Sequence, residues 1–292
     1  MITGFTDIHS HGGGGYSFGD ANPENIFHAL ETHRNHGTTT QIASLVTEPL
    51  ANLKQQIKNL IPFALNKSIA GIHLEGPYLS HAKCGAHDPA LLREPELDEL
   101  KELLEVGQGF IKMITIAPEL SGAIAAIEFL RNQGVAVALG HSNSTETEAL
   151  RAIDAGATIV THMFNGLPEL NHREGTITNA LLINPDIYFE IILDGVHVNR
   201  SAMQLMLNIA PRRIILVTDA MAAAGGSDGE YKIGNLGVKV SEGIATLTSN
   251  GSLAGSTLTM DSAYNRLVSE FNISIEDAKW ASIDLGKKAL GI

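Results

Sequence analysis

The feature that most constrains the fold of this chain is a repeated alternation between short apolar runs and amphipathic stretches of helical character. Eight runs are rich in Ile, Val and Thr, which is typical of strands that are covered on both faces. They are Ile2–His9, Thr38–Val46, Ile69–Glu75, Phe110–Ala117, Val135–Gly140, Thr158–His162, Tyr188–Leu193 and Arg213–Thr218. Amphipathic stretches lie between most of them, with clear examples at Pro23–Asn35, Glu48–Leu60, Pro89–Val106, Ser121–Gln133 and Ser144–Ala155. This alternation predicts an α/β fold of the (β/α)8 TIM-barrel type, with a parallel sheet and right-handed crossovers.

The chain beyond the eighth run departs from this alternation. Segment 231–253 alternates apolar and polar residues and contains the pair Asn250-Gly251, which favours a β-hairpin. We expect a small β-hairpin insertion of one or two hairpins here, then a helix at Thr257–Phe271 that closes the barrel, and a last packed segment at Ile275–Leu290. The prediction for domain organisation is therefore a single barrel domain over residues 1–292, with 231–253 as an insertion.

The composition excludes several classes of protein. With 292 residues, 44% of them hydrophobic and 18% charged, the chain can bury a large core and carries too little charge for disorder. A formal net charge of -12 argues against a nucleic-acid or membrane partner, although a few local donors could still bind one phosphate. The single cysteine, Cys84, excludes an internal disulfide and fits a reducing compartment. Without a secretory signal or an apolar stretch near the roughly 20 residues that cross a bilayer, a soluble cytoplasmic protein is expected.

Histidines and acidic residues fall at the ends of five of the apolar runs. In chain order they are His9 with His11, Glu75, His141, His162 and Asp219. Because the carboxyl ends of barrel strands converge on one point, these side chains can reach a common divalent metal ion. The sequence therefore predicts a metal-dependent hydrolase.

Each of these residues also has a structural interpretation. His141 and His162 could be neutral core imidazoles with ordinary hydrogen bonds. His9 and His11 point to the same face of a strand, where they could form a metal pincer or be ordinary loop histidines. Glu75 interrupts an apolar strand, and a buried unpaired carboxylate is costly, so it must ligate, be paired or be protonated. Asp219 could cap a helix, or could take a proton from water and return it to a leaving group. The occurrence of all these motifs together favours the catalytic interpretation.

The motifs resemble those of the N-acetylglucosamine-6-phosphate deacetylase family, within the amidohydrolase superfamily. The matching segments run through nearly the whole chain, and two of them are especially specific to this family. They are His73-Leu-Glu-Gly-Pro77 and Leu253-Ala-Gly-Ser-Thr-Leu-Thr-Met260. The resemblance implies hydrolysis of the 2-acetamido group of N-acetylglucosamine 6-phosphate, which yields glucosamine 6-phosphate and acetate.

The resemblance also implies roles for the site residues. One or two divalent metal ions (Zn, Fe, Co or Mn) would be bound per subunit. Glu75, His141 and His162 would hold the main ion, and the pair His9 and His11 would hold a second. Asp219 would contact the metal and act as the general acid and base.

The implied substrate contacts lie in further motifs of the family. His87, in Gly85-Ala-His87, would polarise the carbonyl or bind the sugar. Asn165 and Gly166 match a pair that contacts the phosphate, and His197 matches a further substrate contact. In the family an arginine reaches the phosphate across a dimer interface, so Arg173 is the candidate and a homodimer is expected. A bidentate contact between arginine and phosphate is strong and selective.

The sequence departs from the family at its two ends. Family members usually carry a small β-sandwich built from both chain ends, whereas here Met-Ile-Thr directly precedes the first strand and the chain stops at Ile292. We therefore expect the accessory β-sandwich to be absent. Two alternatives stay open: another amidohydrolase, such as an N-acyl amino acid deacylase or a cyclic amidase, and a truncated barrel without activity.

Overall fold

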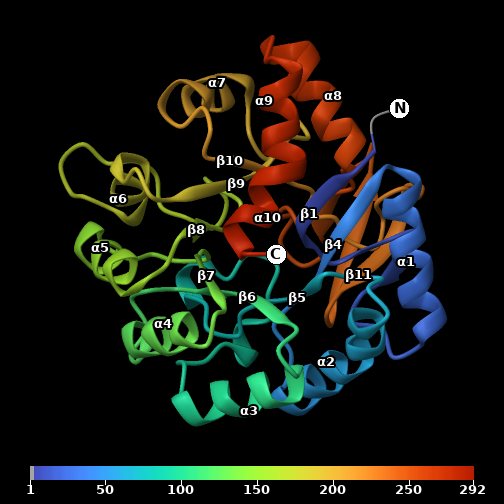
Figure 1. Ribbon diagram of the computed structural model, residues 1–292, viewed down its shortest axis with the longest axis horizontal. Helices are drawn as coiled ribbons and strands as arrows, with labels where there is room; N and C mark the ends of the chain where they lie inside the picture. The colour runs from blue at the N-terminus through green and yellow to red at the C-terminus, as the bar shows by residue number, and fades with distance from the viewer. Residues whose placement is uncertain (1–2) are drawn as a thin grey trace.

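The centre of the molecule is a barrel of eight parallel strands, seen in the computed structural model that describes residues 3–292 (Figure 1). The strands follow one another around the barrel in chain order. They are β1 (Phe5–Ser10), β4 (Thr38–Leu45), β5 (Gly71–Glu75), β6 (Ile111–Ile116), β7 (Ala136–Leu139), β8 (Ile159–Val160), β9 (Tyr188–Ile192) and β10 (Ile214–Val217). The predicted TIM-type fold is confirmed, and each predicted run coincides with a strand, although β1 extends one residue beyond the first run. Ile2, the first residue of the first run, lies outside the described residues.

The barrel closes where β1 meets β10. The two strands do not form a regular ladder, but a bridge joins Ser10 to Ala220 just beyond the end of β10. The N–H of Asp219 donates to the carbonyl of His9 at 2.8 Å, and the N–H of His11 donates to the carbonyl of Ala220 at 2.7 Å. These hydrogen bonds tie the two chain segments that carry His9, His11 and Asp219 to each other.

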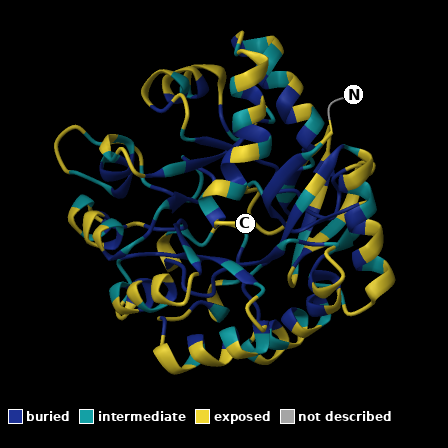
Figure 2. Ribbon diagram, viewed as in Figure 1, coloured by how far each residue is buried: buried dark blue, intermediate teal, exposed yellow. Residues whose placement is uncertain are grey.

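Helices surround the barrel with their apolar sides inward, so that exposed residues form the outer surface (Figure 2). They are α1 (Pro23–Asn35), α2 (Leu50–Leu65), α3 (Leu97–Gly107), α4 (Ala123–Asn132), α5 (Glu146–Ala155), α6 (Ile177–Ile183), α7 (Arg200–Ile209) and α8 (Met260–Phe271). The helix predicted over Pro89–Val106 is wrong in its first part, because only Pro89–Leu91 forms a short 3-10 turn before α3 begins at Leu97. Pro95 explains the delay, since proline lacks a backbone N–H and holds the preceding residue in an extended conformation.

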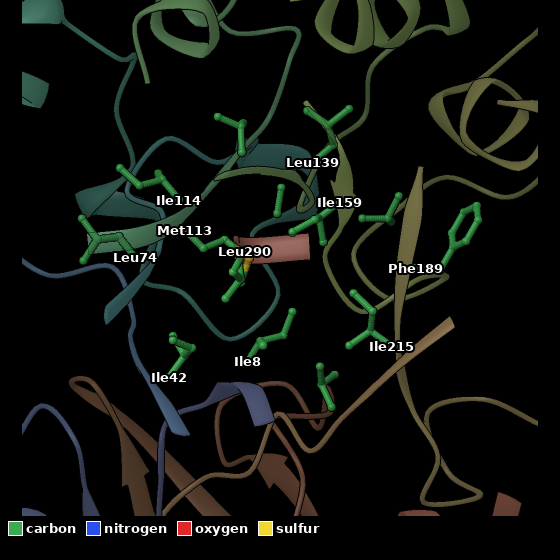
Figure 3. Close-up of a cluster of buried hydrophobic side chains, with 14 of the residues drawn as sticks. Ile8, Ile42, Leu74, Met113, Ile114, Leu139, Ile159, Phe189, Ile215 and Leu290 are labelled. Atoms are coloured by element: carbon green, nitrogen blue, oxygen red, sulfur yellow. The ribbon is translucent and has the colours of Figure 1, made fainter. Parts of the chain in front are cut away.

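The C-terminal segment covers the end of the barrel at which the strands begin. It comprises α9 (Ile275–Lys279), a π-helical stretch (Trp280–Asp284) and α10 (Leu285–Leu290). The hydroxyl of Thr6, near the start of β1, donates to the carbonyl of Ile283 at 2.7 Å. Leu290 lies among the aliphatic side chains of the barrel interior (Figure 3). Because this end is apolar and covered, polar chemistry is confined to the opposite end.

The predicted insertion is a three-stranded antiparallel sheet, that is, two consecutive hairpins where one or two were expected. Its strands are β11 (Gly229–Ile233), β12 (Leu236–Ser241) and β13 (Ile244–Leu247). Val238, Val240 and Leu247 form a small core with Met221 and Ala254, which anchors the sheet beside the end of β10. A second short hairpin, β2 (Gly12–Gly13) with β3 (Tyr16–Ser17), follows β1. Among the described residues, no helix is both long and apolar enough to span a membrane.

Candidate metal centre

The histidines and carboxylates singled out in the sequence converge at the carboxyl end of the barrel. Their ligand atoms form two overlapping groups, in each of which the atoms lie within 4.8 Å of one another. The groups are His9, His11, Glu75 and Asp219, and Glu75, His141 and His162. All of these side chains are buried, and Glu75 belongs to both groups. The structure thus brings together every residue that the sequence pointed to as a metal ligand.

Hydrogen bonds on the outer side of two rings decide which nitrogen faces the cluster. Nδ1 of His141 lies 2.8 Å from the carbonyl oxygen of Lys83, and Nδ1 of His162 lies 3.2 Å from the carbonyl oxygen of Asn165. A carbonyl oxygen only accepts, so Nδ1 carries the proton in both rings. The two Nε2 atoms, 3.1 Å apart, then face the cluster, and in the neutral rings their lone pairs point into it. Neutral imidazoles held in this tautomer are the usual histidine ligands of divalent metals.

The carboxylates of Glu75 and Asp219 bring negative charge into the buried cluster. Oε1 of Glu75 lies 3.0 Å from Nε2 of His162 and 3.2 Å from Nε2 of His141, while its Oε2 lies 3.1 Å from Nε2 of His11. Burial alone would raise the pKa of Glu75, but the surrounding histidines hold it well below its usual range. Burial would also raise the pKa of Asp219, but the histidines outweigh this effect and lower that pKa to about 2.

Two buried anions therefore require positive charge among the rings. The carboxylates raise the pKa of both His9 and His11 against the opposing effect of burial. The charge can come from protons on these rings or from a bound cation that replaces them. The converging imidazole nitrogens and carboxylate oxygens match the mixed donor set of a divalent transition-metal site.

The backbone is strained where three of these side chains enter the cluster. His141, His162 and Asp219 have φ values of 45°, 27° and 48°, in the left-handed region that residues with a Cβ atom rarely adopt. Each lies two residues beyond the end of its strand, at β7, β8 and β10 respectively. Such conformations cost on the order of 1–3 kcal/mol each and concentrate at functional sites. No sequence pattern used above indicates this feature.

His87 lies at the edge of the cluster as a neutral hydrogen-bond donor. The backbone N–H of Thr47 donates to its Nδ1 at 3.3 Å, so Nε2 carries the proton. That Nε2 lies 3.4 Å from Oε2 of Glu75. Burial lowers the pKa of His87 to about 4, which keeps the ring neutral near pH 7. A fixed N–H donor of this kind can stabilise negative charge that develops on a carbonyl oxygen.

A cavity of about 210 Å³ opens over the cluster. Its polar lining includes His11, Glu75, His87, His141, His162, Asn165, His197 and Asp219, and Ile233 and Leu253 contribute apolar surface from the region of the small sheet. Four residues predicted to contact substrate, His87, Asn165, Gly166 and His197, therefore lie beside the metal cluster. The fifth, Arg173, is exposed in the segment between β8 and α6 and does not line the cavity.

Two glycines allow the chain to pass close to the His141 ring. A Cβ atom at Gly85 would lie 2.8 Å from Cε1 of His141, and one at Gly166 would lie 3.1 Å from its Nδ1. Both glycines also have positive φ, at 57° and 64°. Glycine is the residue that fits both requirements, because it has no side chain and adopts this conformation without strain.

Two acidic residues near the site are absent from the predicted set. Oδ2 of Asp194 lies 2.6 Å from Nδ1 of His197, and Oε2 of Glu190 lies 2.8 Å from Nδ1 of His9. Glu190 interrupts the apolar strand β9, which is the same sequence signal that drew attention to Glu75. Asp194 follows that strand in Asp194-Gly-Val-His197 and gave no separate signal.

Comparison with known proteins identifies relatives over the full length of the chain. The sequence pattern described as "Amidohydrolase family" matches residues 1–292. The N-acetylgalactosamine-6-phosphate deacetylase of Escherichia coli O157:H7 is 37% identical over 273 residues, which cover 92% of this chain and 72% of that protein. The N-acetylglucosamine-6-phosphate deacetylase of Vibrio furnissii is 32% identical over 296 residues, which cover 100% of this chain and 74% of that protein.

A solved structure is similar over the same extent. It is that of a mutant N-acetyl-D-glucosamine-6-phosphate deacetylase from Mycobacterium smegmatis in complex with N-acetyl-D-glucosamine-6-phosphate. The two proteins are 40% identical and superpose with a TM-score of 0.97, which covers 100% of this chain and 78% of the other.

Proposed function

This chain belongs to the amidohydrolase family, and we propose that it deacetylates N-acetylglucosamine 6-phosphate, with a divalent cation, to give glucosamine 6-phosphate and acetate. The observation that carries the proposal is the convergence of His9, His11, Glu75, His141, His162 and Asp219 beneath one cavity. The names of the relatives at 32% and 40% identity support the choice of substrate.

The cation would be held by Glu75, His141 and His162, and His9 and His11 with Asp219 would hold a second one. The ligand types suit Zn, Fe, Co or Mn. When bound, such a cation polarises an amide carbonyl and makes a neighbouring water more acidic. The Nδ1 hydrogen bonds of His141 and His162 support this assignment, because they leave the Nε2 lone pairs free for the cation.

The residues of the chain would carry the proton transfers. Asp219 accepts a proton from the attacking water as the oxygen adds to the carbonyl carbon. The Nε2–H of His87 donates to the carbonyl oxygen while negative charge develops there. Asp219 then passes its proton to the amine nitrogen as the C–N bond breaks, and acetate and the amino sugar result. Positive charge in the cluster lowers the pKa of Asp219, so this side chain begins the cycle ionised and able to accept a proton.

The phosphate of the substrate would be recognised by Asn165, the N–H of Gly166 and His197, which belong to the residues that line the same cavity. Asp194 orients the His197 ring. In a homodimer, Arg173 would reach the phosphate of the substrate bound in the neighbouring subunit. This arrangement fits its position, because Arg173 is exposed and does not line the cavity of its own subunit.

Mixed dimers test this arrangement. Arg173→Ala and Asp219→Asn variants, each weak alone, are expected to regain activity when mixed and refolded together. In the mixed dimer the Arg173→Ala subunit keeps its own Asp219 and receives an intact Arg173 from its partner. If each subunit uses its own Arg173, mixing restores nothing.

A second candidate substrate is N-acetylgalactosamine 6-phosphate. The relatives that carry this name, from Escherichia coli O157:H7 and a Shewanella species, are 37% and 36% identical to this chain. The two substrates differ only in the configuration of one hydroxyl-bearing carbon, so both present the same acetamide and phosphate to the cavity.

Acetate release tests the proposal. The substrates are the two phosphorylated sugars and unphosphorylated N-acetylglucosamine, supplied to protein of known metal content before and after chelation. We expect release from a phosphorylated sugar, little from the unphosphorylated one, and loss on chelation that Zn, Fe, Co or Mn restores. Equal rates with and without phosphate would instead favour another amidohydrolase activity, and no release from metal-loaded protein would contradict deacetylation altogether.

A further inference from the structure

We propose that Glu190 is a positioning residue that locks the His9 ring in the tautomer able to bind a cation. His9 and Glu190 are both fully buried, and Nδ1 of His9 lies 2.8 Å from Oε2 of Glu190. A carboxylate at this distance accepts a hydrogen bond from the Nδ1–H group. In the neutral ring that a cation requires, the Nε2 lone pair then faces the cluster.

The opposite edge of the His9 ring faces the cluster, as this tautomer requires. Nε2 of His9 lies 3.2 Å from Nε2 of His11, 3.5 Å from Oδ1 of Asp219 and 3.6 Å from Oε1 of Glu75. If the ring flipped or changed tautomer, an N–H would point at the place where these atoms converge. Glu190 prevents this arrangement from outside the cluster, without being one of its ligands.

The same carboxylate oxygen also reaches the second half of the cluster. Oε2 of Glu190 accepts a hydrogen bond from the backbone N–H of His162 at 3.2 Å. His162 is the residue whose backbone has φ of 27°, so this hydrogen bond restrains a strained segment. One oxygen atom thus orients a ring of one metal group and the backbone of the other.

Glu190 differs from the other outer partners in carrying a carboxylate. The Nδ1 atoms of His141 and His162 face backbone carbonyl oxygens, whereas that of His9 faces a carboxylate. Such carboxylate–histidine pairs make the imidazole a stronger metal ligand, and their loss usually lowers metal affinity about 10- to 100-fold. The inference rests on the proposed use of a cation but requires no particular substrate.

The test compares three variants by cation binding rather than by turnover. In Glu190→Gln, the amide oxygen can still accept hydrogen bonds from His9 and His162. The amide N–H₂ then takes the place of Oε1, an atom that has no hydrogen-bond partner among the described residues. Glu190→Ala loses both hydrogen bonds. Glu48→Gln is the matched control, because Glu48 is also buried but its hydrogen bond goes to Asn52.

We expect the dissociation constant for Zn²⁺, measured against a competing chelator, to rise about tenfold in Glu190→Gln and about 100-fold in Glu190→Ala. The control should match the wild type. The visible spectrum of the Co²⁺-loaded protein should change in Glu190→Ala and not in the control, and thermal unfolding should show that each variant is folded. Wild-type affinity in Glu190→Ala overturns the inference alone. Absence of Zn²⁺ binding by the wild type overturns the inference together with the proposed cation.

Discussion

The carboxylate of Asp7 accepts a hydrogen bond from the hydroxyl of Thr218 at 2.6 Å, across the seam where the first and last barrel strands meet. Its other oxygen accepts from the backbone N–H of Thr218 at 3.2 Å and from that of His9 at 3.3 Å. The seam has no regular ladder, so these side-chain contacts replace part of it. They also hold His9 and Asp219, on opposite sides of the seam, at the same level of the barrel.

Replacing Asp7 should separate the effect of its hydrogen bonds from that of its charge. Burial raises the pKa of Asp7 to about 6, so this site disfavours the ionised form of the side chain. In Asp7→Asn, the amide oxygen can accept the two backbone N–H groups and the amide N–H₂ can donate to the Thr218 hydroxyl. We expect urea unfolding to show a change below about 1 kcal/mol for Asp7→Asn. A loss of about 2–4 kcal/mol is expected for Asp7→Ala, which leaves buried donors without partners. Equal losses in the two variants would contradict this account.

Asp219→Asn should remove proton transfer while leaving the cavity intact in shape. An amide cannot accept a proton from water near pH 7, so we expect kcat for deacetylation to fall by at least about 10²–10⁴-fold. Zn²⁺ content must be measured on the same sample, since Asp219 also lies in the metal group. Asp7→Asn makes the same chemical change at a buried aspartate outside the cluster and should keep most of the activity. Turnover near the wild-type level in metal-loaded Asp219→Asn would refute its role as general base.

Gly85→Ala should weaken cation binding by displacing the His141 ring. The added Cβ atom would lie 2.8 Å from Cε1 of that ring, so either the ring or the loop must move. The matched control is Gly134→Ala, where φ is also positive at 74° but no atom lies within 4 Å of the new Cβ. Both variants should lose similar stability from backbone strain, of about 1 kcal/mol. Only Gly85→Ala is expected to show a higher dissociation constant for Zn²⁺ in competition titrations, and equal affinities would show that the loop yields instead.

His33 should make the protein less stable as the pH falls. Its buried ring contacts the carbonyl oxygen of Gly12 through Nε2 at 2.9 Å, and burial lowers its pKa to about 4. The ordinary pKa of histidine is about 6.5, so between these values the unfolded chain binds more protons than the folded one. Acidification from about pH 6.5 to pH 4 therefore lowers the free energy of unfolding. His33 contributes at most about 3 kcal/mol to this loss.

The pH dependence of unfolding isolates this contribution. Urea unfolding at several pH values should give a flatter dependence in His33→Gln than in the wild type over this range. The comparison uses the difference between the two slopes, because other histidines titrate in both proteins. Parallel slopes would show that His33 is not the group responsible.

Much of the architecture follows from local patterns. The eight apolar runs formed strands because short length, enrichment in β-branched residues and flanking glycine or polar residues all favour a strand. The helix expected from Pro89 was wrong because the amphipathic pattern was extended through Pro95, where the chain cannot continue a helix. Whether the small sheet contains one hairpin or two stayed open, since alternation alone does not say how many turns divide a segment.

The sequence by itself determined where the strands lie along the chain and which residues stand at their ends, because both depend on neighbours within a few positions. Only the tertiary structure decided which ring nitrogen of His9, His141 and His162 faces the cluster, and that Glu190 supports it. His9 and Glu190 are 181 positions apart, and His87 and Thr47 are 40 apart. Such partners meet only when the barrel closes, so no local pattern can specify the tautomers, strained turns and buried charges on which the site depends.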